Sequence, residues 1–271
     1  ILPEGPEVRK TVDGLTGCFL NKEIKALAFH SGRYKKKDFT GYLDMCEDLP
    51  KLVTGVGCKG KFIYFLFADG SSLWNTLGMS GYWSETIGKH PRAILATTDN
   101  RTMFYNDMRN FGTFRYTNFQ EDLDKKLASI GPDLLSEDVS LEQFKETLLR
   151  GKRADKPISQ LLMDQTVVSG VGNYLKAEIL YNTKISPHRI CRDITEDEFK
   201  SLLYASKSIM RLSDESGGAT IKNYRDSSGK KGVYTRRFAV YNQETDPLGN
   251  AVIREKTADK RTTHWVPEIQ K

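Results

Sequence analysis

The feature that most constrains the fold is a change in hydrophobic period near residue 130. Between Ile24 and Tyr116, apolar residues form short runs separated by turn residues, as in KFIYFLF and RAILATT. Beyond residue 135, they recur at intervals of three and four, as in SLEQFKETLLR and EDEFKSLLYASKSIMRL. The first pattern is typical of antiparallel strands and the second of amphipathic helices. The sequence therefore predicts a β-rich N-terminal part and a helical C-terminal part.

We predict an α+β fold with two domains, because 271 residues are enough to build two hydrophobic cores. Residues 1–130 are expected to form an antiparallel β-sandwich flanked by helices. Residues 131–271 are expected to be helical, with further helices in ISQLLMDQTVV (158–168) and GNYLKAEILYNT (172–183). The alternating segments VIREK and RTTHWV around TADK predict a closing β-hairpin.

The charge distribution favours a polyanionic partner. The net charge is +6, and residues 217–271 hold 11 Lys and Arg against 6 Asp and Glu. A basic face of this kind fits a phosphate backbone, although a solvated basic tail would give the same count. The run 35–37 (KKK) is interpreted as a solvated loop.

Composition also limits the cell compartment and the class of site. No apolar run approaches the ~20 residues of a membrane span, and no signal-peptide pattern is present, so an intracellular protein without membrane contact is expected. The four cysteines never fall in a CxxC pair, which indicates neither a disulfide framework nor a zinc site.

Two glycines between helical segments predict an anion-binding turn. Gly170 and Gly172 precede Asn173, where a helix is expected to begin. Glycine lets backbone N–H groups approach a ligand closely, and the free N–H groups of a helix N-terminus attract anions. A nucleic-acid phosphate suits such a turn, while an ordinary connection between helices would show the same pattern.

The chain opens ILPEGPEV, which predicts a helix start. Gly5 and Pro6 are expected to be the N-cap and the first helical residue, before apolar residues at helical spacing. Glu4 and Glu7 would then lie at the positive end of the helix, where charge complementarity alone stabilises by only ~0.3–1 kcal/mol.

Six segments in this order form a more specific pattern. They are PEGPEV, GMSG (78–81), DMRNFG (107–112), GPD (131–133), LLMDQTVVSGVGNYLKAEILY (161–181) and KRTTHWVPEIQK (260–271). Together they resemble the formamidopyrimidine-DNA glycosylase / endonuclease VIII family. The resemblance implies a helix-two-turn-helix motif at about 145–213, a lesion-capping loop at about 214–235 and a finger hairpin at about 236–271.

The same resemblance implies a bifunctional DNA glycosylase and lyase of base excision repair. Such an enzyme would act without a cofactor, as a monomer, on double-stranded DNA with oxidised bases or abasic sites, or on bubble or single-stranded DNA. A non-catalytic binder of damaged or abasic DNA is the alternative from another functional class.

The resemblance assigns catalytic roles near the N-terminus. The amine of Pro3 would attack the anomeric carbon and form a Schiff base, followed by β,δ-elimination. Glu4 would act as general acid and base, with Glu7 as a supporting carboxylate, and Lys61 would hold a phosphate beside the lesion. Because only a terminal amine can react in this way, residues 1–2 are expected to be remnants that the active form lacks, or to mark an impaired chain.

Further DNA contacts follow from the resemblance. Met79, Arg109 and Phe111 would fill the space left by an extruded nucleotide, where Met and Phe replace lost stacking and Arg bonds the orphaned base. The alternative is that Met79 and Phe111 are core residues. Asn173 and the backbone of Gly170–Gly172 would hold a phosphate, and Arg261 would contact DNA from the finger.

The predicted finger departs from the commonest family pattern. No cysteine follows Cys191, and Val266 and Ile269 stand where many members place zinc ligands, which leaves His264 alone. We therefore expect no metal and a "zincless finger" held by packing of residues such as Trp265.

The motifs that indicate substrate preference resemble two different branches of the family. PEGPEV looks like the endonuclease VIII branch, which prefers oxidised pyrimidines, whereas residues 217–241 resemble the lesion-capping loop of the formamidopyrimidine branch. Oxidised pyrimidines, formamidopyrimidines and hydantoins are expected substrates, and mainly 8-oxoguanine specificity is the alternative.

Overall fold

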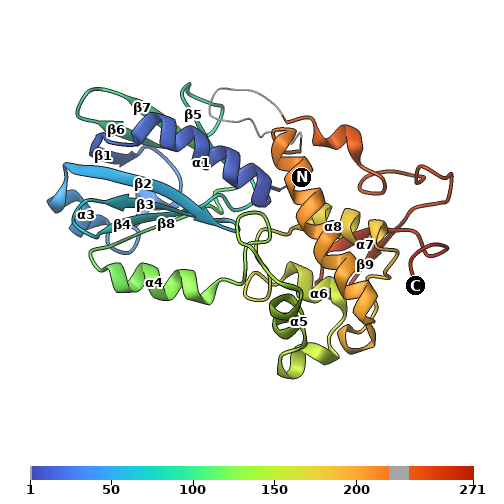
Figure 1. The fold of residues 1–271 in the computed structure, drawn as a ribbon. Helices are drawn as coiled ribbons and strands as arrows, with labels where there is room; N and C mark the ends of the chain where they lie inside the picture. The colour runs from blue at the N-terminus through green and yellow to red at the C-terminus, as the bar shows by residue number, and fades with distance from the viewer. Residues whose placement is uncertain (1, 220–231) are drawn as a thin grey trace.

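The computed structural model describes residues 2–219 and 232–271, so the predicted lesion-capping loop lies outside them over positions 220–231. Figure 1 shows a strand-rich lobe beside a helical lobe, with the N-terminus between them. The predicted α+β fold is confirmed.

Eight antiparallel strands build the N-terminal lobe in the order β5-β7-β6-β1-β2-β3-β4-β8. The rings of Tyr105 on β7 and Phe114 on β8 nevertheless lie 5.0 Å apart between centroids, although their strands are distant in this order. The sheet therefore folds over itself into the predicted sandwich. The strands are β1 (Glu23–Phe29), β2 (Lys51–Lys59), β3 (Phe62–Phe67), β4 (Ser72–Thr76), β5 (Gly81–Ser84), β6 (Pro91–Thr97), β7 (Thr102–Asp107) and β8 (Thr113–Thr117).

Two short strands at the ends of this order, β5 and β8, were not foreseen. Each has four or five residues and pairs with one neighbour, β5 with β7 and β8 with β4. Segments this short carry too few alternating positions to be recognised before pairing is known.

Four helices belong to the same lobe: α1 (Gly5–Phe19), α2 (Arg33–Lys36), α3 (Tyr42–Asp48) and α4 (Gln120–Ser129). Helix α1 buries Val8, Val12 and Leu15 as predicted. Its N-cap, however, is Glu4 and not Gly5, which is already helical. The expected solvated loop at 35–37 is exposed but begins within the short helix α2.

The C-terminal lobe holds α5 (Leu141–Leu149), α6 (Ile158–Met163), α7 (Asn173–Asn182) and α8 (Glu196–Glu215), with 3-10 turns at Gly151–Asp155, Cys191–Asp193 and Tyr234–Arg237. The helix predicted over 158–168 is therefore too long. It ends because the Asp164 carboxylate accepts the backbone N–H of Thr166 at 2.9 Å, which starts a turn.

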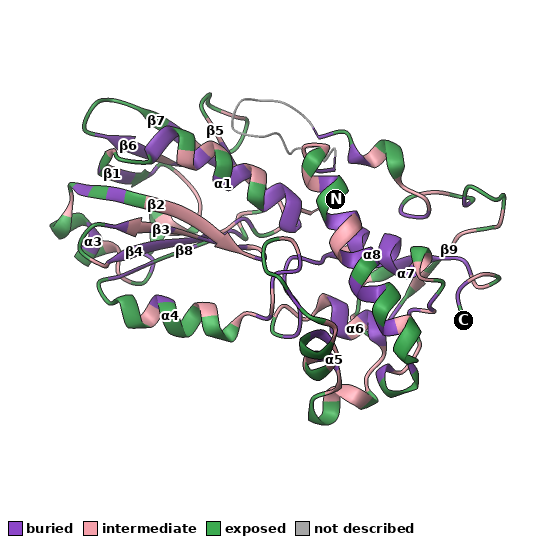
Figure 2. Ribbon diagram, in the orientation of Figure 1, coloured by how far each residue is buried: buried purple, intermediate pink, exposed green. Residues whose placement is uncertain are grey.

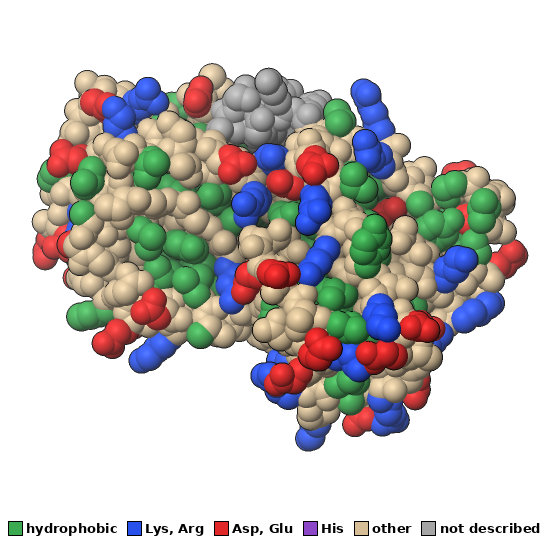
Figure 3. Space-filling model, viewed as in Figure 1, with side chains coloured by type: hydrophobic (Ala, Val, Ile, Leu, Met, Phe, Trp, Pro, Cys, Tyr) green, Lys and Arg blue, Asp and Glu red, His purple; other side chains and the backbone are tan. Residues whose placement is uncertain are grey.

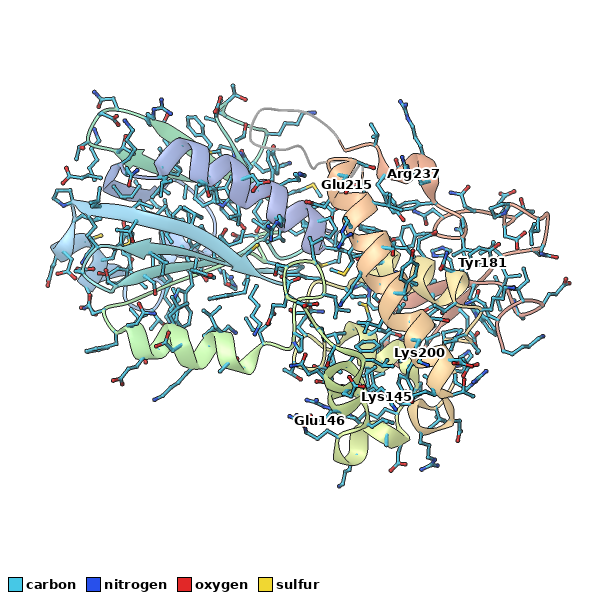
Figure 4. All side chains as sticks on the ribbon, viewed as in Figure 1. Lys145, Glu146, Tyr181, Lys200, Glu215 and Arg237 are labelled. Carbon is cyan, nitrogen blue, oxygen red and sulfur yellow. The ribbon has the colours of Figure 1, made fainter. Side chains whose placement is uncertain are left out.

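Helix α7 is the centre of this lobe, and all its residues from Tyr174 to Leu180 are buried (Figure 2). Its charged residues have partners: Lys176 Nζ lies 2.6 Å from the Asp259 carboxylate. Glu178 accepts backbone N–H groups of residues 239–241. Tyr181, labelled in Figure 4, donates its hydroxyl to Asp246 at 3.0 Å. The C-terminal segment is thus anchored on α7.

The predicted hairpin is confirmed as β9 (Ile253–Lys256) paired with β10 (Thr262–Trp265). Val266 is fully buried, and the Trp265 indole donates to Glu255 at 3.0 Å. Gln270 accepts the N–H of Val266 and donates to the carbonyl of Ile185. Packing and hydrogen bonds therefore hold the hairpin against the helices.

The sandwich core offers a stability prediction. Phe65 is fully buried, and its ring meets those of Phe19 and Trp83 at 6.2 and 6.4 Å. We expect Phe65→Ala to lower the free energy of unfolding by about 3–5 kcal/mol, because it removes buried apolar surface and leaves a cavity. Urea denaturation measures it. Phe119→Ala, at a side chain 68% exposed, should change stability by less than about 0.5 kcal/mol; equal losses would contradict this.

Candidate active site

The site begins with Glu4, whose carboxylate caps a helix from the other lobe. Its oxygens accept the backbone N–H groups of Gly172 and Tyr174 at 2.8 Å and of Leu175 at 3.2 Å. These groups are the free N–H donors at the start of α7, where the helix dipole favours a negative charge. Glu4 is 1% exposed, so the contact joins the N-terminal strip to α7 in a buried setting.

The same contact occupies part of the glycine turn at residues 170–172. The turn holds an anion from the same chain, the Glu4 carboxylate. The N–H of Gly172 donates to Glu4, and the N–H of Gly170 donates to Gln165 Oε1 at 3.0 Å. A Cβ at Gly172 would lie 2.4 Å from the Glu4 carboxyl carbon, so only glycine leaves room for the contact.

Glu7 lies behind Glu4 and supports it. One carboxylate oxygen accepts the Glu4 N–H at 2.8 Å, and the other accepts the Tyr174 hydroxyl at 2.8 Å and the Ala219 N–H at 2.7 Å. The side chain is fully buried. Tyr174 was not foreseen as a site residue, because a tyrosine in an apolar helix pattern gives no sign that its hydroxyl meets a distant carboxylate.

Burial sets the protonation behaviour of these groups. It raises the pKa of Glu4 to about 6, against the opposing effects of Lys61 and the α7 N–H groups. Burial and the neighbouring Glu4 raise the pKa of Glu7 to about 7. Burial also lowers the pKa of Lys61, with Glu4 opposing and Arg261 adding to the effect. Glu4 can therefore exchange a proton close to neutral pH.

Lys61 lies at the tip of the β2–β3 hairpin, beside Pro3. The hairpin tip is fixed to the other lobe, since the Gly60 N–H donates to Asp133 Oδ2 at 2.8 Å. Pro3 and Lys61 line a cavity of about 270 Å³ together with Leu77, Gln165 and other residues. The structure thus brings Pro3 and Lys61 to one cavity.

Met79, Arg109 and Phe111 lie on two adjacent loops, residues 78–81 and 107–112, which we call the tip loops. Arg109 Nη1 lies 3.2 Å from Met79 Sδ. Phe111 is 55% exposed and Met79 is half-buried, so the alternative that they are core residues is wrong. Figure 2 shows the exposed and buried parts of this lobe.

Asn173 and Arg261 lie where the hairpin meets α7. Asn173 Nδ2 donates to the carbonyl of Thr262 at 2.9 Å, and its Oδ1 accepts Lys176 Nζ at 2.9 Å. Arg261 precedes β10 and is half-buried. Lys61, from the N-terminal lobe, is thus close enough to both Glu4 and Arg261 to interact with their charges.

The surface charge is mixed. On the face in Figure 3, Lys and Arg side chains over the helical lobe are interspersed with Asp and Glu. Among residues 2–219 and 232–271, no group of three or more His, Cys, Asp or Glu side chains is arranged to hold a metal ion. In the same part of the chain, no helix is long and apolar enough to cross a membrane.

Three models of one protein family match most of the chain. The profile of the formamidopyrimidine-DNA glycosylase N-terminal domain matches residues 2–114, its H2TH domain matches 130–225, and its C-terminal domain matches 234–271. The chain belongs to the formamidopyrimidine-DNA glycosylase family. This family membership confirms the resemblance drawn from the six sequence segments.

Individual relatives cover the whole chain. Formamidopyrimidine-DNA glycosylase of Oceanobacillus iheyensis is 31% identical over 99% of this chain and 98% of its own. The solved MutM (Fpg) protein of Thermus thermophilus is 30% identical, with a TM-score of 0.87 over 99% and 98% of the two chains. A Lactococcus lactis FPG mutant bound to Fapy-dG DNA is 25% identical, with a TM-score of 0.87 over 99% and 100%. None of these three carries the endonuclease VIII name, so that subdivision stays a prediction.

The raised pKa values predict a pH dependence of stability. Glu4 and Glu7 have folded-state pKa values of about 6 and about 7, against an ordinary value of 4.5. The folded state then binds protons more tightly than the unfolded state, so the free energy of unfolding should fall as pH rises from about 4.5 to 7. The loss from Glu7 is on the order of 3 kcal/mol.

Urea unfolding across this pH range measures the slope. Glu7→Gln should flatten it, because the variant cannot titrate, whereas Glu121→Gln on the exposed face of α4 should leave it unchanged. An identical slope in the Glu7→Gln protein would contradict the prediction.

Proposed function

We propose that this chain is a bifunctional DNA glycosylase and lyase that uses Pro3 as its nucleophile. The observation that carries the proposal is the Glu4 carboxyl: it follows Pro3 directly, is buried at the start of α7, and has a pKa of about 6. A group that gains and loses a proton near neutral pH, adjacent to an amine nucleophile, suits both halves of this reaction.

In the proposed reaction, the terminal amine of a chain that begins at Pro3 attacks the anomeric carbon. The bond from that carbon to the damaged base breaks, and the departing base takes up the proton that the amine loses. Protonated Glu4 gives its proton to the ring oxygen as the sugar opens and a Schiff base forms. Glu4, now ionised, then accepts a proton from the adjacent sugar carbon, and the 3′ phosphate leaves as the new carbon–carbon double bond forms. A second elimination of the same kind expels the 5′ phosphate. Lys61, beside Pro3 in the cavity, binds a phosphate near the lesion.

DNA binding is proposed to use both domains. Residues 1–130 form the catalytic domain, and residues 131–271 form the domain that binds most of the DNA backbone. The target nucleotide leaves the duplex, and Met79, Arg109 and Phe111 take its place. Asn173 and Arg261 lie beside the hairpin and suit phosphate contacts. Binding should weaken as salt rises, because phosphate contacts release counterions.

The proposed substrate is double-stranded DNA with formamidopyrimidine lesions first, followed by hydantoins and oxidised pyrimidines. The formamidopyrimidine class is supported by the names of the relatives and by the Fapy-dG DNA in the Lactococcus lactis complex. A related MutM structure contains carbocyclic 8-oxo-G DNA, which favours testing 8-oxoguanine beside them. The chain is proposed to act as a monomer, without a cofactor and with a finger that needs no zinc.

Borohydride trapping tests the nucleophile. A chain that begins at Pro3 should form a covalent adduct with abasic duplex DNA, whereas the same chain beginning at Ile1 should not. The physical reason is that an amide nitrogen has a delocalised lone pair and cannot form a Schiff base. Absence of an adduct from the Pro3 chain would leave damaged-DNA binding without catalysis as the function.

Glu4→Gln tests the acid and base. Base excision should fall by about 10²–10⁴-fold, because the amide cannot exchange a proton. Affinity for a duplex with a non-cleavable abasic analogue should stay within about threefold of the unmodified chain, because the amide oxygen can still accept the Gly172 and Leu175 N–H groups that a single carboxylate oxygen now binds. Glu121→Gln, on the exposed face of α4, is the matched control. Parallel losses of excision and binding would indicate a purely structural role for Glu4.

A further inference from the structure

The two tip loops meet over one buried carboxylate. Asp107, the last residue of β7, is fully buried. Its Oδ1 accepts the Ser80 hydroxyl at 2.5 Å and the Asn110 N–H at 3.0 Å, and its Oδ2 accepts the Gly112 N–H at 2.8 Å. Ser80 belongs to the first tip loop, and the other two donors belong to the second.

The Ser80 hydroxyl continues this connection toward the exposed tips. Its oxygen donates to Asp107 and also accepts the backbone N–H of Arg109 at 2.8 Å. The Arg109 guanidinium in turn lies 3.2 Å from Met79 Sδ. A continuous set of contacts therefore leads from the buried carboxylate to side chains of both tip loops.

Tyr105 closes the arrangement from below. Its hydroxyl lies 3.3 Å from Asp107 Oδ2, and burial together with Asp107 raises its pKa well above the usual value, which keeps it a donor. A Cβ at Gly112 would lie 1.6 Å from this hydroxyl, and a Cβ at Gly81 would lie 2.3 Å from it. Glycine at the end of each tip loop is thus required for both loops to pack on Tyr105.

Two arginines hold the second tip loop from outside. Arg92 Nε donates to the Asp107 carbonyl at 2.8 Å, and its Nη2 donates to the Met108 carbonyl at 3.2 Å. Arg33 donates to the Gly112 carbonyl. Asp107 therefore accepts hydrogen bonds from backbone N–H groups of the second tip loop, and the two arginines donate hydrogen bonds to backbone carbonyls of the same loop.

We propose that Asp107 is a positioning residue that locks the two tip loops into one rigid unit, so that Met79, Arg109 and Phe111 enter the duplex together. This inference rests on the proposed function, in which these side chains replace an extruded nucleotide. Loops that are already ordered lose less conformational freedom when they insert, which speeds insertion and stabilises the inserted state. Asp107 is fully buried at the base of the second tip loop, so in this proposal it acts through the exposed side chains and not by contacting DNA itself.

The chemistry of the acceptor predicts what Asp107→Asn does. The carboxylate faces four donors: Ser80, Asn110, Gly112 and Tyr105. An amide offers one oxygen acceptor and adds two N–H donors. The amide NH₂ would therefore point at some of these four donors, and those hydrogen bonds would be lost. The tip loops would then separate while the surface cations that bind phosphates stay in place.

Stopped-flow fluorescence tests the proposal with a duplex that contains a tetrahydrofuran abasic analogue opposite 2-aminopurine. Insertion of the tips beside the 2-aminopurine changes its fluorescence. We expect insertion to be about tenfold slower for Asp107→Asn and about threefold slower for Ser80→Ala, which removes one of the four donors. Affinity for undamaged duplex DNA should stay within twofold for both variants.

Asp69→Asn is the matched control, because Asp69 also accepts a serine hydroxyl at 2.5 Å and a backbone N–H, but in the turn between β3 and β4. It should insert at the normal rate. Normal insertion by Asp107→Asn would overturn the role of Asp107, as would a parallel loss of affinity for undamaged DNA. A wild-type protein that gives no fluorescence change would instead overturn the proposed function.

Discussion

The structure depends on one buried contact, the Glu4 carboxylate against the first turn of α7. A buried carboxylate is unfavourable unless its oxygens accept hydrogen bonds, and here three backbone N–H groups supply them. Because Glu4 precedes α1 and α7 is the centre of the helical lobe, the contact also fixes the two lobes relative to each other. The charge of Lys61 and these three N–H groups oppose the effect of burial, so the pKa of Glu4 is raised only to about 6. The group that suits the proposed chemistry is thus also a structural link.

Other buried carboxylates follow the same principle. Glu7 accepts donors from three separate segments of the chain, and Asp133 holds the hairpin tip that carries Lys61. Asp107 gathers both tip loops. In each case a buried carboxyl group accepts hydrogen bonds from N–H and O–H groups that would otherwise be buried without partners. These side chains do not contact the substrate in the proposed reaction, yet they set the positions of those that do.

Much of the fold could be predicted from the sequence, because the spacing of apolar residues shows which positions of a helix or strand face the core. The strands β3 and β6, the helices α5, α7 and α8, and the terminal hairpin all follow their predicted segments closely. The prediction was wrong where local chemistry overrides the period: α6 ends at the Asp164 turn, and the N-cap of α1 is Glu4. The edge strands β5 and β8 exist through pairing, which a single short segment does not reveal.

By itself, the sequence determined the fold class, the order of the elements and the identity of the family, since these depend on hydrophobic period and on six ordered motifs. Only the tertiary structure decided which anion the glycine turn holds. Sequence spacing places Gly172 at a helix start but cannot say that Glu4, from the beginning of the chain, reaches it first. The sequence also could not identify Tyr174 or Asp107 as residues that support the site, because hydrogen bonds between distant segments leave no periodic pattern in the sequence. They exist only after both cores have packed and brought donors and acceptors together.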